Sequence, residues 1–226
     1  MKKKTAALAL LVLAGTLIAQ AQNLEAVLNS MDKAAANFHT AQTDFVWDQY
    51  QKVVDEHDIQ KGTMYFRRQG EDVQMAANIT DPEKKYVLFS GGTVSVYLPK
   101  AGQVTEYNAG KNKADFETFL VLGFGGRGHD LAKSFDVKYG GMEPVQGINA
   151  AKLELTPKSQ RVANMFETIT LWIDLSRGVS VQQLFNEHSG DYRLAKYNNI
   201  RLNEKINNDV FKLKTSGKVT YVRPNS

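Results

Sequence analysis

The spacing of apolar side chains changes once early in the chain. Between residues 24 and 38 they recur at steps of three and four, with charged and amide side chains between them, which predicts an amphipathic helix capped by Asn23. From Thr40 onward the period is two, and short runs rich in β-branched and aromatic residues are separated by turn signals. We expect strands near residues 40–54, 58–69, 72–79, 85–90, 93–98, 102–107, 135–139, 151–156, 167–174, 179–187, 192–200 and 210–213.

One segment in the middle of the chain interrupts the strand pattern. Apolar residues of the segment 115–124 lie at helical spacing behind Asp115, and Gly123 is suited to end a helix there. We therefore expect a short helical lid. The predicted fold is mainly β: a strongly curved antiparallel sheet or unclosed β-barrel of about eleven strands, covered by the N-terminal helix and the mid-chain lid.

The first 21 residues have the pattern of an export signal. Three lysines follow Met1, an uncharged run rich in Ala and Leu follows them, and Ala19-Gln20-Ala21 is a small-x-small cleavage site. The run is shorter than the roughly 20 residues that a bilayer span needs. We expect cleavage after Ala21, export, one domain over residues 22–226 and no stable insertion into a membrane.

Composition narrows the function further. The chain has no Cys, which excludes thiol chemistry and the lipid anchor that a lipoprotein signal would attach. The whole chain has 28 Lys and Arg residues and 24 Asp and Glu residues. When the three signal lysines are left out, the basic and acidic residues nearly balance. No basic patch is interleaved with aromatic residues, so we expect no nucleic-acid partner.

Motifs for catalysis are absent from the sequence. The four His residues are scattered, and neither a G-x-S-x-G elbow nor an H-E-x-x-H pair accompanies them. Asp55, His57 and Asp58 could suggest a metal site, but strand alternation points neighbours to opposite faces, so a polar hairpin tip is the better interpretation. We expect a protein that is not an enzyme and has no metal or cofactor; a secreted hydrolase is the weaker alternative.

A glycine-rich segment follows the expected lid. Residues 123–128 spell G-x-G-x-x-G, the dinucleotide-binding pattern, but they follow an apolar helix rather than a parallel strand. A hinge for the lid is the better interpretation, and a simple surface loop is the alternative. The hinge residues would be Gly123, Gly125, Gly126 and Gly128.

The order of several local motifs resembles the LolA-type family of periplasmic outer-membrane lipoprotein carriers. The matching segments are the N-terminal helix running into Phe38-His39-Thr40-Ala41, the strand Gly62-Thr63-Met64-Tyr65-Phe66-Arg67-Arg68, Ser90-Gly91-Gly92-Thr93-Val94-Ser95-Val96-Tyr97 followed by Gln103-Val104, the lid segment with Asp130-Leu131, and Asn208-Asp209-Val210-Phe211-Lys212-Leu213. The family usually has Pro after the arginine of its second strand, where this chain has Gln69. The central strands are also more polar than in the best-known carriers, which suggests a divergent subfamily.

This resemblance implies a monomeric periplasmic carrier that binds acyl chains of lipoproteins, or related lipids, in an apolar cavity. Loading would come from an inner-membrane lipoprotein-releasing transporter, and delivery would be to an outer-membrane acceptor. An arginine, Arg68 or Arg67, would latch the lid through backbone carbonyls. The alternative in the same fold is a sensor or regulator of envelope lipoproteins, which usually carries a second domain.

Apolar side chains on the inward faces of the strands and lid are the candidates for lining such a cavity. Ordinary core packing is the alternative for each of them. They are Met64, Phe66, Met75, Leu88, Val94, Val96, Phe116, Phe119, Leu120, Leu122, Phe124, Leu171 and Ile173.

Overall fold

The computed structural model describes residues 21–70, 72–108, 110 and 122–224. Within them, twelve strands form a single sheet in the order β12-β6-β5-β4-β3-β2-β1-β11-β10-β9-β8-β7. Neighbours pair antiparallel, except that β12 runs parallel to β6. The strands are β1 (Thr40–Gln51), β2 (Glu56–Gln69), β3 (Asp72–Asp81), β4 (Lys85–Ser90), β5 (Thr93–Leu98), β6 (Gln103–Asn108), β7 (Phe135–Val145), β8 (Ile148–Pro157), β9 (Thr168–Asp174), β10 (Val179–Asn186), β11 (Tyr192–Leu202) and β12 (Thr220–Val222).

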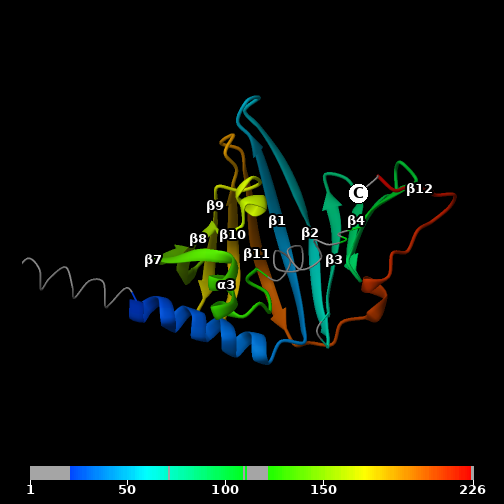
Figure 1. Cartoon of the computed structure of the whole chain (residues 1–226). Coiled ribbons are helices and arrows are strands. Elements are labelled where there is room, and N and C mark those ends of the chain that lie inside the picture. Colours follow the sequence, from blue (N-terminus) through cyan, green and yellow to red (C-terminus); the bar gives the residue numbers. More distant parts are fainter. Residues whose placement is uncertain (1–20, 71, 109, 111–121, 225–226) are drawn as a thin grey trace, which may run out of the picture.

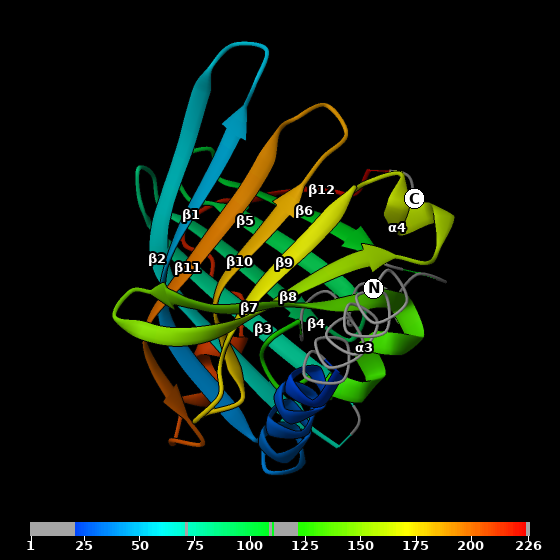
Figure 2. The same ribbon diagram turned by 90° about the vertical axis from the view of Figure 1, so that its left-hand side faces the viewer.

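The sheet is curved but not closed, because β7 and β12 are its two edges and do not pair with each other. Figures 1 and 2 show its two halves bending around a common concave side. This confirms the predicted unclosed barrel of about eleven strands.

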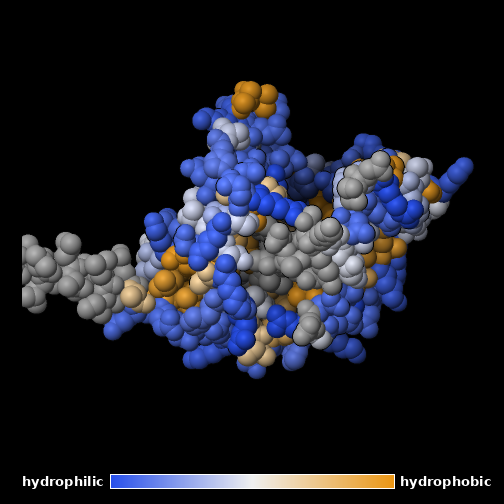
Figure 3. All heavy atoms as spheres, in the orientation of Figure 1, coloured by the Kyte–Doolittle hydropathy of each residue, from blue (hydrophilic) through white to orange (hydrophobic). Residues whose placement is uncertain are grey.

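The hairpin of β1 and β2 extends beyond the neighbouring strands (Figure 1). Its tip carries Val53, which is 92% exposed, and Val54. Figure 3 shows the resulting apolar cap on an otherwise polar projection.

Helices lie at both ends of strand β9: the N-terminal helix meets the turn after it, and a single helical turn lies before it (Figure 2). The N-terminal helix is described over residues 21–36, and α3 (Gly128–Ser134) and the single turn α4 (Gln160–Ala163) follow later. Val27 and Met31 of the N-terminal helix pack with Leu153 and Leu171 of β8 and β9 in a buried cluster. No helix in the described ranges is both long and apolar enough to cross a membrane.

The mid-chain helix differs from the expected one. Residues 122–125 form a turn, and the described helix, α3, begins only at Gly128. The remainder of the predicted lid, including Phe116, Phe119 and Leu120, lies outside the described residues, as does the predicted signal up to residue 20.

The prediction of a strand at residues 210–213 is wrong. Asn208–Phe211 is a 3-10 helix, η2, because the side chain of Asn207 accepts a hydrogen bond from the backbone N–H of Asp209 and caps the turn. The last strand is instead β12, three exposed residues without the alternation that identifies a half-buried strand.

Strand β7 is longer than predicted. It continues past Gly140 and Gly141 to Val145, with a shift of register between Tyr139 and Gly141. Gly141 has φ +98°, a conformation that side chains rarely adopt, so the two glycines mark a bulge within the strand rather than its end.

Candidate functional site

A cavity of about 860 Å³ occupies the concave side of the sheet. Its lining comes from strands β1 to β6, β10 and β11, from the turn at residues 122–124 and from α4 and the residues after it. Most of the lining side chains are apolar. The volume falls within the range of about 300–1,000 Å³ that is usual for small-molecule sites.

Seven of the predicted lining residues do face this cavity. They are Met64, Phe66, Met75, Val94, Val96, Leu122 and Phe124. Those on strands share one parity along each strand, so the period of two in the sequence located this face.

Three predicted lining residues lie elsewhere. Leu88 is on the opposite face of β4, because its neighbour Val87 is the residue that faces the cavity. Leu171 and Ile173 are completely buried in the cluster beneath the N-terminal helix. Strand β9 is buried on both faces, so alternation alone could not assign a side to them.

Phe124 closes one end of the cavity. Its ring stacks on Phe66 with centroids 5.0 Å apart, and it meets Tyr197 edge-on at 4.9 Å. Phe124 is only 1% exposed, and its ring packs against Phe66 of β2 and Tyr197 of β11 on the concave side of the sheet.

A buried polar chain holds the turn that carries Phe124. The hydroxyl of Tyr197 donates to Oε1 of Gln183 at 3.0 Å, and Nε2 of Gln183 donates to the carbonyl of Leu122. Burial raises the pKa of Tyr197 far above its usual value, so the phenol stays protonated and remains a donor. The backbone N–H of Ser180 also donates to the carbonyl of Gly123 at 2.8 Å.

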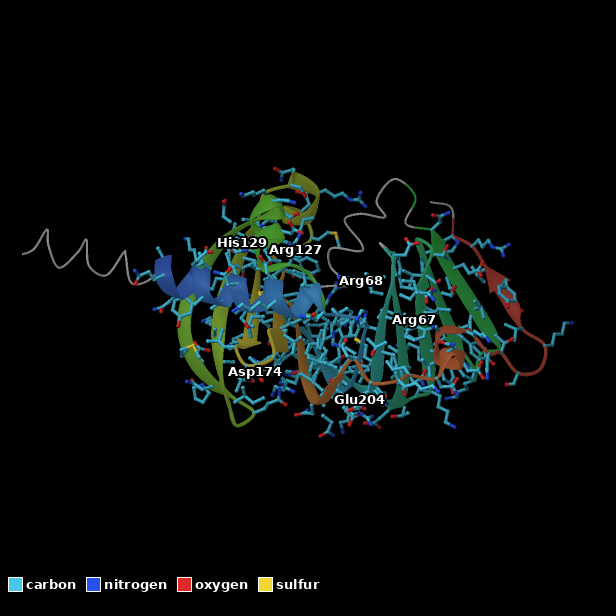
Figure 4. The ribbon with its side chains drawn as sticks, turned by 90° about the horizontal axis from the view of Figure 1, so that it is seen from below. Arg67, Arg68, Arg127, His129, Asp174 and Glu204 are labelled. Atoms are coloured by element: carbon cyan, nitrogen blue, oxygen red, sulfur yellow. The ribbon has the colours of Figure 1, made fainter. Side chains whose placement is uncertain are left out.

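Arg68 joins the same turn to the N-terminal helix. Its Nη2 donates to the carbonyl of Gly125 at 2.5 Å and its Nη1 donates to the carbonyl of Ala35 at 3.0 Å. The guanidinium also lies 5.6 Å from the centre of the Phe38 ring. Figure 4 shows Arg68 beside the end of the helix.

Arg67 points to the other face of the sheet. Its Nε donates to Gln74 at 3.0 Å, its Nη1 donates to Asn208 at 2.5 Å, and its guanidinium lies 4.2 Å from the Phe211 ring centre. Arg67 therefore anchors η2, whereas Arg68 is the arginine that contacts the glycine-rich segment.

The predicted hinge glycines are tightly packed. Gly123 and Gly125 have φ +79° and +80°. A Cβ on Gly123 would overlap the Cβ of Ser180, and one on Gly125 would lie 2.6 Å from the Phe38 ring. A Cβ on Gly128 would lie 2.5 Å from the backbone of Leu28. These three glycines permit close contact with the sheet and helix in the described conformation; Gly126 lies between them.

Several lining residues were missed by sequence reasoning. Phe45, Trp47 and Tyr197 share a face along β1 and β11, and alternation within those strands could have found them. Val162 and Met165 reach the cavity from α4 and the residues after it, and a single turn of helix has no periodic signal.

The described residues contain no group of three or more His, Asp and Glu side chains placed to hold a metal ion. Near the β1–β2 tip, Asp55, His57 and Asp58 contact three separate partners. Tyr50 donates to Asp55 at 2.9 Å, Nδ1 of His57 lies 2.8 Å from Asp48, and Gln60 donates to Asp58 at 2.7 Å.

Solved structures share this fold at low sequence identity. An uncharacterized conserved protein from Thermus thermophilus aligns with a TM-score of 0.57 and 12% identity, over 88% of this chain and 97% of that one. MucB aligns with a TM-score of 0.56 and 14% identity, and the alignment covers 88% of this chain and 65% of the MucB chain. The Pseudomonas aeruginosa MucA/MucB complex gives a TM-score of 0.51 and 15% identity, over 85% of this chain and 61% of that one.

Sequence comparison identifies the family. No curated protein sequence is similar enough to the chain to count as a relative. The model of the family described as outer membrane lipoprotein carrier protein LolA matches residues 36–214, which include strands β1 to β11 and η2. The chain therefore belongs to the LolA family of periplasmic lipoprotein carriers, which are binding proteins rather than enzymes.

Proposed function

We propose that the protein is a periplasmic carrier that holds acyl chains of lipoproteins, or related lipids, in the concave cavity and transports them toward the outer membrane. The observation that carries the proposal is the cavity of about 860 Å³ with largely apolar walls. Each CH₂ moved from water into such a cavity contributes about 0.8 kcal/mol. Met64 and Met75 on its wall are flexible enough to adapt to chains of different shape.

Phe124 and Arg68 form the element that a ligand would move. Phe124 occupies the buried end of the cavity, and Arg68 bonds to the carbonyl of the next residue. An acyl chain that reaches this end competes with the Phe124 ring, so entry of the chain favours release of the turn and of the Arg68 latch. A ligand that binds the open state of the turn more tightly than the closed state shifts the equilibrium toward the open state.

Family membership supports the route of the cargo. Loading would come from a lipoprotein-releasing transporter in the inner membrane, and delivery would be to an acceptor at the outer membrane. The predicted export signal supports this route, because it would carry the chain into the compartment between the two membranes.

The test is native mass spectrometry of the processed protein, residues 22–226, purified without detergent, followed by extraction and identification of the bound lipid. Recovery of acylated ligand supports the carrier. A protein that is free of ligand and also ignores added lipoprotein and lipid would contradict it.

Two variants on adjacent residues of β5 locate the ligand. Val96 lines the cavity, whereas Ser95 points to the other face, and both are partly buried. Val96→Trp should lower the amount of bound lipid because the indole fills the cavity, and Ser95→Trp should leave it unchanged. Equal uptake by both variants would place the lipid outside this cavity.

A transfer assay separates the carrier from a sensor of envelope lipoproteins. The protein is loaded with radiolabelled lipoprotein and mixed with acceptor vesicles made from outer-membrane lipids. A carrier passes the label to the vesicles with time, whereas a sensor retains it.

A further inference from the structure

The charged side chains that the structure describes on the cavity wall all have one sign. Within the described lining they are Lys85 of β4, Arg161 of α4 and Arg193 of β11. The same lining contains neither Asp nor Glu. An apolar cavity for uncharged chains alone needs none of these cations, since burying part of a charged side chain has a cost in free energy.

Arg193 lies on a row of the sheet nearer the β1–β2 tip than Tyr197 does. Lys85 starts on the row of Tyr197, but its Nζ reaches Gln60, which lies nearer that tip. Near Phe124 the cross-strand rows are apolar, with Phe66 beside Met75 and Met64 beside Ala77.

Farther along the strands, toward the β1–β2 tip, the facing residues become polar. Gln60 of β2 lines the cavity and accepts a hydrogen bond from Lys85, and Gln49 of β1 lines it and pairs with Arg193. The cavity wall therefore changes from apolar to cationic along the strand direction.

Exposure follows the same direction. Phe66 is 3% exposed and Met64 is 7% exposed, whereas Trp47 is 37% exposed and Met165 is 49% exposed. On β1 and β2 the lining is thus buried toward Phe124 and open to water toward Arg193, whereas Ile79 beside Lys85 is 7% exposed and Tyr107 of β6 is 50% exposed.

Lys85 and Arg193 keep donors for an anion. Nζ of Lys85 donates to the amide oxygen of Gln60 at 3.2 Å, and its other two protons can reach further acceptors. Nη2 of Arg193 pairs with Glu187 at 2.8 Å, and the side chain is 37% exposed, so other N–H groups of its five-donor guanidinium can reach further acceptors. Its Nε is buried and has no hydrogen-bond partner among the described residues. Glu187 therefore offsets the charge of Arg193 from outside the lining, and the charged groups of the described lining are all cationic.

We propose that the cavity selects acyl lipids with an anionic, phosphate-bearing head group, with the chains toward Phe124 and the head group between Lys85, Arg161 and Arg193. Ammonium and guanidinium groups form charge-assisted hydrogen bonds to phosphate oxygens. The flexible stems of these side chains pack on the apolar wall while the charged groups remain near water. This inference rests on the proposed function, because it names the class of lipid that the same cavity takes.

The test is competition between lipids with identical chains. The protein is incubated with vesicles that contain equal amounts of dioleoyl phosphatidic acid, dioleoylglycerol and dioleoyl phosphatidylcholine, and native mass spectrometry then measures the bound species. Phosphatidic acid should be bound about fivefold or more over the other two, and the preference should fall as salt is added.

A charge-neutral variant tests the residues. Lys85→Gln combined with Arg161→Gln should bring the preference close to one, and a circular dichroism spectrum like that of the unaltered protein shows that the variant is folded. The matched control is Lys100→Gln combined with Lys133→Gln, which removes two exposed lysines that pair with Glu83 and Asp130. This control should keep the preference of the unaltered protein.

A further arm separates a lipid head group from free phosphate. Glycerol 3-phosphate added at the concentration of the lipids should displace none of the bound phosphatidic acid, and full displacement would overturn the inference. Equal uptake of all three lipids, unchanged in the charge-neutral variant, would overturn the head-group selection and leave the carrier standing. A protein that takes up no lipid would overturn both.

Discussion

Arg68 reaches the carbonyl oxygen of Gly125, 57 residues farther along the chain, with a hydrogen bond of 2.5 Å. Its second hydrogen bond, to Ala35, ends on the N-terminal helix. One side chain thus links β2, the glycine-rich turn and the helix.

Replacing this arginine should loosen the closed end of the cavity. Arg68→Leu removes two hydrogen bonds from a charged donor and should lower the free energy of unfolding by about 2 kcal/mol without changing the fold. It should also speed the release of bound lipid, because the turn that carries Phe124 loses its tie to β2. Denaturant unfolding and lipid retention over time measure the two effects.

Arg67→Leu is the matched control for that variant. Arg67 contacts Gln74, Asn208 and Phe211 on the opposite face. The control should also lose stability but release lipid at the unaltered rate. Equal release rates for Arg68→Leu and the unaltered protein would remove Arg68 from the mechanism.

Gly123 should be among the least replaceable glycines. Gly123→Ala adds a Cβ at φ +79° that would overlap Ser180, whereas Gly147→Ala adds one at φ +80° with nothing within 4 Å. The left-handed backbone alone costs about 1–2 kcal/mol, and overpacking adds about 1–3 kcal/mol. Unfolding measurements should therefore find Gly123→Ala more destabilising than Gly147→Ala, and similar losses would show that Ser180 moves away at little cost.

The buried hydroxyl of Tyr197 should contribute more than its size suggests. Tyr197→Phe keeps the ring that contacts Phe124 but leaves the buried Oε1 of Gln183 without its donor. An unsatisfied buried acceptor costs about 1–3 kcal/mol. Tyr197→Phe combined with Gln183→Leu removes both groups, so the double variant should lose less than the sum of the two single variants; strict additivity would deny that they act as a pair.

The sequence predicted the sheet well because its strands alternate. Met64, Phe66 and Arg68 share parity on β2, and the structure places all three on the concave side or at its closed end. Helical spacing likewise indicated the N-terminal helix, since its apolar face packs on β8 and β9.

The site was harder to predict because contacts between distant segments build it. Nothing in local spacing tells that Arg193 meets Glu187 across a hairpin, or that α4 brings Arg161 to the cavity. At residues 208–211 the apolar Val210 and Phe211 resembled a strand, but the cap formed by Asn207 decided the local structure.

The stability of the contact between α3 and the N-terminal helix should depend on pH through His129. Hydrogen bonding to Asp32, at 2.6 Å, and the nearby Glu25 hold the pKa of His129 above its usual value despite some loss of hydration. A histidine whose pKa is raised by folding stabilises the folded state. This contribution is complete below the pKa of the unfolded state, about 6.5, and is lost as pH rises through the pKa of the folded state. Because His129 is 44% exposed, solvent screens the pair and the effect should be small.

The gap in unfolding midpoint between the unaltered protein and His129→Gln should therefore be largest near about pH 6 and shrink above neutrality. Glu25→Gln, which removes the more distant carboxylate, should narrow that gap only in part. A gap that widens as pH rises would show that the neutral ring, not the ion pair with Asp32, holds α3 in place.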